Sequence, residues 1–198
     1  MIVALDCAPA RTGYTSAAGR CSAISPAPSS RGRAQQRADI RMILAPKLRL
    51  DRERHGARVA IIEGYLLHSG TPLATIRRAE LHGIIEEALW REAYDPPVIV
   101  NPATLKSFAR LVLGRTPESK DDIISAALTL GYDPHGDDNE ADSALLHALG
   151  RQWYATGAEQ PVPGWPGLNE LSRDVRKTLS LLPWPPNPLL DEIGAARG

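Results

Sequence analysis

The chain has 198 residues, of which 43% are hydrophobic and 23% are charged, and its 23 basic and 23 acidic side chains give a formal net charge of zero. This composition is typical of a globular protein and excludes a chain that is disordered throughout. No apolar run approaches the roughly 20 residues that a membrane-spanning helix needs, so we expect no membrane association. The sequence shows no signal-peptide pattern and only two cysteines, Cys7 and Cys21, which favours a cytoplasmic protein.

The zero net charge is an average over segments of opposite sign. Residues 31–58 contain nine basic and three acidic side chains, a net charge of +6, whereas residues 137–142 contain four acids and no base. A metal-dependent enzyme acting on a polyanion needs both features, because acids hold cations and bases hold phosphates. The alternative interpretation is a solvated helix face and an acid-rich helix N-terminus, which charge alone does not exclude.

In chain order, short apolar runs alternate with segments of helical periodicity. The runs predict buried strands at residues 2–5, 59–63 and 98–100, and the segment 13–25 has room for one or two more strands. The periodic segments predict helices at residues 33–54, 73–93, 104–112, 120–130 and 139–154. This alternation indicates an α/β domain in which helices and a sheet form layers.

After Gly157 the composition changes. Seven prolines fall between residues 161 and 188, with Trp165 and Trp184 among them and one expected helix at residues 169–182. We therefore divide the chain into a domain of residues 1–156 and a Pro/Trp-rich C-terminal extension of residues 157–198. Such an extension either packs on the main domain or mediates association.

Three acids stand where buried residues are expected. Asp6 and Glu63 end two predicted strands, and Asp142 lies near the apolar side of the last predicted helix, one turn after Asp138. A buried charge is costly unless it is paired or bound to metal. Carboxylates gathered at one point suit Mg²⁺ or Mn²⁺, and two such ions about 4 Å apart can promote phosphodiester cleavage.

Each acid also has a structural alternative. Asp6 could cap the turn that follows it, and Glu63 could pair with Arg77 or Arg78. Asp137 and Glu140 have the spacing of a capping box, which we favour for these two residues. Among the histidines, His147 lies five residues beyond Asp142 and off its helical face, so solvent or the core is the better expectation than a metal.

Six motifs occur in a fixed order between residues 1 and 156. They are residues 1–6 (MIVALD) with Arg11-Thr12-Gly13, residues 59–63 (VAIIE), 79–83 (AELHG), 101–106 (NPATLK), 119–124 (SKDDII) and 139–145 (NEADSAL). Together they resemble the RuvC-like Holliday-junction resolvases, especially the versions found in bacteriophages. The chain departs from the family pattern at Asn139, where relatives often have an acid or a histidine, and at Cys7-Ala8-Pro9, where they often have Pro-Gly.

The resemblance implies an RNase H-like mixed sheet flanked by helices and a Mg²⁺-dependent endodeoxyribonuclease. It implies a homodimer that resolves four-way DNA junctions by paired nicks, in the host bacterial cytoplasm if the protein comes from a bacteriophage. One or two Mg²⁺ ions, or Mn²⁺ as a substitute, would bind Asp6, Glu63 and Asp142, with Asp6 between the ions and Asp138 as the fourth candidate. The expected DNA contacts are Lys120 at or near the scissile phosphate, Lys106, Tyr65 as the stacking residue, and Arg33, Arg37 and Arg41 on the backbone.

Three other functions remain open on the sequence. A nuclease of the same fold could prefer flaps, forks or other branched DNA, because shape recognition depends on loops that motifs do not describe. A catalytically inactive junction-binding protein is a second alternative, to which Asn139 points. A fragment of an actin-like kinase is a third, although the chain is short for it and has no later Gly-rich nucleotide motif.

Overall fold

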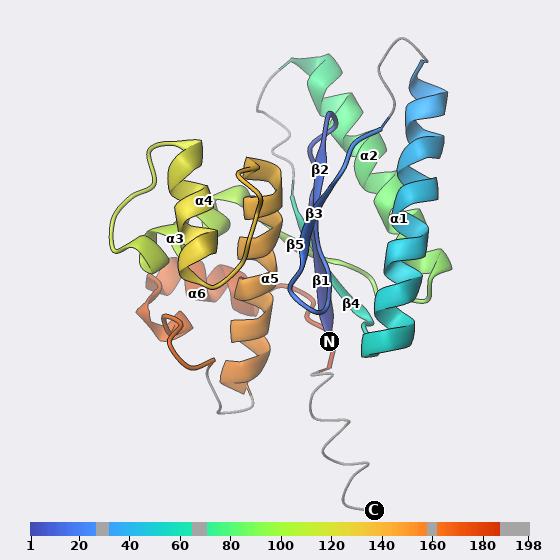
Figure 1. Ribbon diagram of the computed structural model, residues 1–198. Helices are drawn as coiled ribbons and strands as arrows, with labels where there is room; N and C mark the ends of the chain where they lie inside the picture. The colour runs from blue at the N-terminus through green and yellow to red at the C-terminus, as the bar shows by residue number, and fades with distance from the viewer. Residues whose placement is uncertain (27–31, 65–70, 158–161, 187–198) are drawn as a thin grey trace, which may run out of the picture.

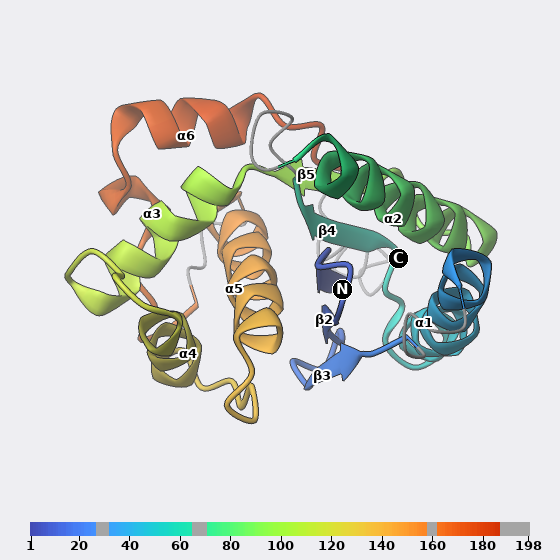
Figure 2. The same cartoon turned by 90° about the horizontal axis from the view of Figure 1, so that it is seen from above.

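The computed structural model describes residues 1–26, 32–64, 71–157 and 162–186. It is a three-layer α/β structure with one sheet between two layers of helices (Figure 1, Figure 2). Within these ranges no helix has both the length and the apolarity needed to cross a membrane.

The sheet is mixed, as expected. Its strands are β1 (Ile2–Asp6), β2 (Thr12–Thr15), β3 (Cys21–Ile24), β4 (Val59–Glu63) and β5 (Val98–Val100), in the spatial order β3-β2-β1-β4-β5. Strands β1, β4 and β5 are parallel, and β2 and β3 add an antiparallel half, so the segment 13–25 supplies two strands. Leu5 pairs with Ile62, which brings the next residues, Asp6 and Glu63, to the same edge of the sheet.

The strand sequences are apolar at consecutive positions because both faces of the sheet are covered. Val3 and Leu5 of β1 pack toward α1 (Arg33–His55) and α2 (Pro72–Arg91). Ile2 and Ala4 pack toward the other layer, which contains α3 (Pro102–Leu113), α4 (Lys120–Thr129) and α5 (Asp138–Gly157). Figure 2 shows the two layers on opposite sides of the strands. Successive side chains of a strand point to opposite faces, so each strand contributes to two cores.

Helix α5 packs unusually close to the sheet, and two glycines make this possible. A Cβ atom at Gly13 of β2 would lie 1.9 Å from the backbone oxygen of Asn139, in the first turn of α5. A Cβ atom at Gly150, farther along α5, would lie 1.9 Å from Cδ1 of Ile61 and 2.9 Å from Cδ1 of Ile2. The contact at Gly13 is with backbone, so no side chain fits there and this glycine fixes how closely the first turn of α5 lies on β2. At Gly150 the close atoms are the ends of two isoleucine side chains, which would have to move to admit a Cβ atom.

The described part of the C-terminal extension packs on the layer of α3, α4 and α5. It contains a short 3₁₀ helix (Leu168–Glu170) and α6 (Arg173–Ser180), where the sequence predicted one longer helix. Leu168, Leu171 and Leu179 join the same hydrophobic core as α5. Trp184 stacks on Trp153 of α5 with 4.9 Å between ring centroids.

Candidate active site

The two strand-end acids meet at the edge of the sheet. Asp6 is 4% exposed and its carboxyl group is hydrogen-bonded to that of Glu63. Burial and then the neighbouring charge of Glu63 raise the pKa of Asp6 well above its ordinary value. Burial also raises the pKa of Glu63, although less, because the hydrogen bond from Asp6 favours its ionised form. Burial and the proximity of the two groups therefore favour a protonated carboxyl at this edge more than water would.

The first turn and a half of α5 bring two more acids to this edge. Asp138 and Asp142 are close enough that their charges raise the pKa of Asp6. Burial, followed by the charges of Glu63 and Asp138, raises the pKa of Asp142 to about 7. Because Gly13 sets the depth of this turn, the Thr-Gly of β2 is part of what places Asp142 beside the strand-end acids.

Four carboxyl groups in partly desolvated surroundings have the composition of a site for a hard cation. Carboxylate oxygens are the ligands that Mg²⁺ and Mn²⁺ prefer, and a bound cation would offset the repulsion that raises the pKa values of these acids. In the conformation found here, no three His, Cys, Asp or Glu side chains among the described residues are arranged to hold a metal ion. The donor set fits a divalent cation, and binding one requires these side chains to move closer together.

Two lysines add positive charge at the rim of the acidic cluster. Lys120 is the first residue of α4, a position fixed by the capping box that Ser119 and Asp122 form. Its ammonium group forms an ion pair with Asp138 while the side chain stays 78% exposed. Lys106 of α3 is exposed and lies in electrostatic range of Glu63 and Asp142, whose pKa values its charge lowers. The structure thus brings both predicted lysines to the predicted acids.

Arg11 and Arg78 lie beside the site, Arg78 as one of the two partners that the sequence offered for Glu63 and Arg11 without any contact expected from the sequence. Arg11, in the turn after β1, forms ion pairs with Asp137 at 2.7 Å and with Glu140 at 3.6 Å. Asp137 also accepts a hydrogen bond from the backbone N–H of Glu140, which is the N-cap half of the expected capping box. The other half is not formed, because the backbone N–H of Asp137 donates to the Pro134 carbonyl and the Glu140 carboxylate contacts His135. Arg78 of α2 lowers the pKa of Glu63, as its structural alternative required. Only contacts across the fold identify Arg11 as a neighbour of the site.

The predicted DNA contacts on α1 are less free than the sequence suggested. Arg37 forms an ion pair with Glu80, and Arg41 forms one with Glu87, both across the interface with α2. The positive charge of residues 31–58 is therefore partly used in joining two helices. Arg33 has no ion pair among the described residues, and Tyr65, the predicted stacking residue, lies outside them.

No protein-family model and no curated protein matches the chain. Its structure is similar to two solved structures of RuvC from Thermus thermophilus. The first, in complex with Holliday junction substrate, has a TM-score of 0.57 and 12% sequence identity, over 81% of this chain and 98% of the other. The second has a TM-score of 0.51 and 14% identity, over 81% of this chain and 99% of the other. The chain therefore has the RuvC fold, which confirms the RNase H-like architecture expected from its sequence.

Proposed function

We propose that this protein is a metal-dependent endodeoxyribonuclease that resolves four-way DNA junctions. The observation that carries the proposal is the convergence of Asp6, Glu63, Asp138 and Asp142 at one edge of the sheet, with Lys120 at its rim. Clustered carboxylates with an adjacent cation are suited to phosphodiester hydrolysis, in which cations hold and polarise a phosphate. The likeness in fold to a RuvC solved with Holliday junction substrate supports branched DNA as the substrate class.

One or two Mg²⁺ ions, with Mn²⁺ as a substitute, would supply a hydroxide nucleophile near neutral pH and stabilise charge on the scissile phosphate. Asp6, Glu63 and Asp142 would hold them, with Asp138 as a further ligand. Asp6 has the central place because its carboxyl group interacts with each of the other three. Because carboxylate ligands must be deprotonated, the raised pKa values of Asp6 and Glu63 make metal binding stronger as the pH rises.

The lysines would orient the DNA backbone. Lys120 lies on the exposed side of Asp138, so its ammonium group can meet a phosphate oxygen next to the carboxylates. Lys106 places a second positive charge near Glu63 and Asp142, where it can contact an adjacent phosphate. Tyr65 would stack on a base, and Arg33, Arg37 and Arg41 would contact the backbone farther from the cut, Arg37 and Arg41 by exchanging their glutamate partners.

Cutting two strands at symmetric positions requires two copies of this site, since one acidic cluster can cut one strand at a time. We therefore include a homodimer in the proposal, because two-fold symmetry in the protein matches two-fold symmetry in the junction. A cytoplasmic location belongs to the same proposal, as it gives the enzyme access to the DNA of a bacterial cell.

The test is a cleavage assay on synthetic four-way junctions, flaps, forks and plain duplexes in Mg²⁺. We expect Asp6→Asn and Glu63→Gln to lower junction cleavage about a hundredfold or more. Asp174→Asn, an exposed acid on α6, is the matched control and should cut like wild type. Metal-dependent cutting that survives both site substitutions would refute the assignment. If the protein cut flaps or forks in preference to junctions, the proposed substrate would be wrong and the nuclease assignment would stand. If it bound junctions tightly without cutting them in Mg²⁺ or Mn²⁺, it would be a junction-binding protein and not an enzyme.

A further inference from the structure

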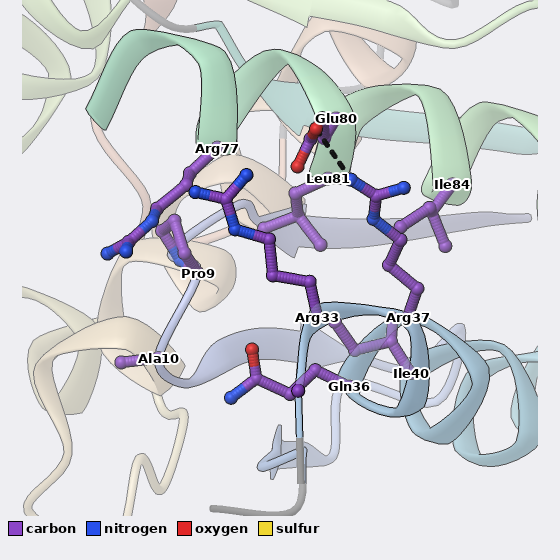
Figure 3. A pocket seen from close by; sticks show the side chains of 11 residues that line it. Pro9, Ala10, Arg33, Gln36, Arg37, Ile40, Arg77, Glu80, Leu81 and Ile84 are labelled. Carbon is purple, nitrogen blue, oxygen red and sulfur yellow. Dashed lines mark ion pairs between the residues drawn. The ribbon is translucent and has the colours of Figure 1, made fainter. Parts of the chain in front are cut away.

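A cavity of about 470 Å³ lies between α1 and α2, outside the acidic cluster (Figure 3). Its floor is apolar, formed by Ile40, Leu81 and Ile84, each no more than 6% exposed. Pro9 and Ala10, from the turn that follows β1, line one side. A concave site of this volume with an apolar floor is typical of a place where a small group binds.

The polar lining of the cavity carries an excess of positive charge. Arg33 and Arg37 extend into it from α1 and Arg77 from α2, against one acid, Glu80, which leaves a net charge of +2 (Figure 3). Only Arg37 is paired, with 2.5 Å between its Nη2 atom and Oε1 of Glu80; among the described residues neither Arg33 nor Arg77 forms an ion pair. Arginines over a desolvated floor attract a bidentate oxyanion more strongly than they would in open water.

The cavity adjoins the edge of the sheet that carries the acids. Pro9 is three residues beyond Asp6, so the two Cα atoms are at most about 11 Å apart, close to three nucleotide rises along a DNA strand. On α2, Arg77 lines the cavity and its neighbour Arg78 acts on Glu63. A strand seated on the acidic cluster therefore has a phosphate within reach of this cavity.

We propose that the cavity between α1 and α2 is a phosphate subsite that holds a DNA backbone phosphodiester a few nucleotides from the cut. The inference rests on the proposed function, because it assigns a second anchoring point to the same DNA. Arg33 and Arg77 provide the first contacts. Arg37 joins them when the phosphate displaces Glu80. The Glu80 carboxylate and the DNA phosphate therefore compete for the guanidinium group of Arg37.

This competition predicts opposite signs for two kinds of substitution. Removing Arg33 and Arg77 weakens binding, whereas Glu80→Gln strengthens it, because Arg37 is released and a repelling charge is lost. If the ion pair between Arg37 and Glu80 only joined two helices, Glu80→Gln would lower stability and leave DNA affinity unchanged or reduced.

The test measures the affinity for a synthetic four-way junction as a function of NaCl concentration, in an Asp6→Asn background that prevents cutting. Each phosphate contact contributes about 0.9 to the slope of log K against log salt. We expect Arg33→Gln with Arg77→Gln to reduce that slope by one to two, and Glu80→Gln to raise the affinity. Arg173→Gln with Arg176→Gln, two exposed arginines on α6, removes the same two charges away from the cavity lining and should leave the slope unchanged.

The failures of the two proposals can be told apart. If the background protein binds the junction but the double variant keeps the full slope, the subsite is wrong and the nuclease proposal stands. If no variant binds branched DNA, the proposed function fails and the subsite fails with it. A third arm uses inorganic phosphate alone: stabilisation of wild type but not of the double variant, with an unchanged DNA slope, would overturn the subsite in favour of a free anion.

Discussion

Replacing Asp142 by asparagine should stabilise the metal-free protein at pH 8, although it removes a proposed catalytic acid. The pKa of Asp142 is about 7 in the folded chain, against an ordinary value of 3.8, chiefly because of burial and then the charges of Glu63 and Asp138. A raised pKa means that the folded state binds the proton more tightly than the unfolded state. Folding stability therefore falls as the pH rises from about 4 through 7.

The size of the effect follows from the two pKa values. Each pKa unit corresponds to about 1.4 kcal/mol, so at pH 8 the ionised carboxylate costs the fold up to about 4 kcal/mol. An amide has nearly the same shape and does not ionise. The difference in unfolding free energy between Asp142→Asn and wild type should therefore reach a few kcal/mol at pH 8 and vanish near pH 4.

Urea unfolding in EDTA at pH 4, 6 and 8 measures this difference. Asp121→Asn, an exposed acid at the start of α4, is the control and should show no gain that grows with pH. Adding Mg²⁺ at pH 8 should stabilise wild type more than Asp142→Asn, because the ion binds the ionised acids of the folded state. A variant that is less stable than wild type at pH 8, or a difference that does not change with pH, would refute the reasoning.

Two further predictions concern residues behind the site. Burial lowers the pKa of His147 to about 3; its Nδ1 atom lies 2.7 Å from the Tyr132 hydroxyl, and its Nε2 atom has no partner among the described residues. Because the folded state resists protonation of His147, the free energy of unfolding should fall by up to about 5 kcal/mol as the pH is lowered from 6.5 to 3. His147→Gln should reduce this pH dependence when unfolding is measured with urea, and an unchanged pH dependence would contradict the pKa shift. Gly13→Ala should lower the free energy of unfolding by about 1–3 kcal/mol and should also reduce cleavage, because it displaces α5. Gly83→Ala is the control: its Cβ atom meets open space in α2, so it should raise the free energy of unfolding by about 1 kcal/mol. If the two variants changed unfolding and cleavage equally, the close-packing argument would be wrong.

The strand-end acids were predictable because their positions follow from local pattern. Buried runs ending in Asp6 and Glu63 indicate parallel strands, and parallel strands present their carboxyl ends at one edge. Asp142 required more, since its distance from that edge depends on how deeply α5 lies on the sheet. The sequence pattern gave Gly13 a place in the first motif but no packing role, whereas the structure shows that its missing side chain admits the backbone of Asn139. Whether a glycine is needed for close packing depends on which segment lies against it, and a single sequence does not contain that information.

The pairing of charged side chains could not be predicted from the sequence either. Seven of the nine basic residues of the +6 segment lie on α1, but Arg37 and Arg41 lie opposite Glu80 and Glu87, more than 40 residues later in the chain. Whether these residues meet depends on the register between two helices, which periodicity within each helix does not determine. As a result, ion pairs occupy Arg37, Arg41 and Arg49 of α1, whereas Arg33, beside the cavity, forms none among the described residues. Arg33, Arg37 and Arg77 thus place positive charge beside the carboxylate edge, so a phosphate bound there would lie close to the groups proposed to cut the strand.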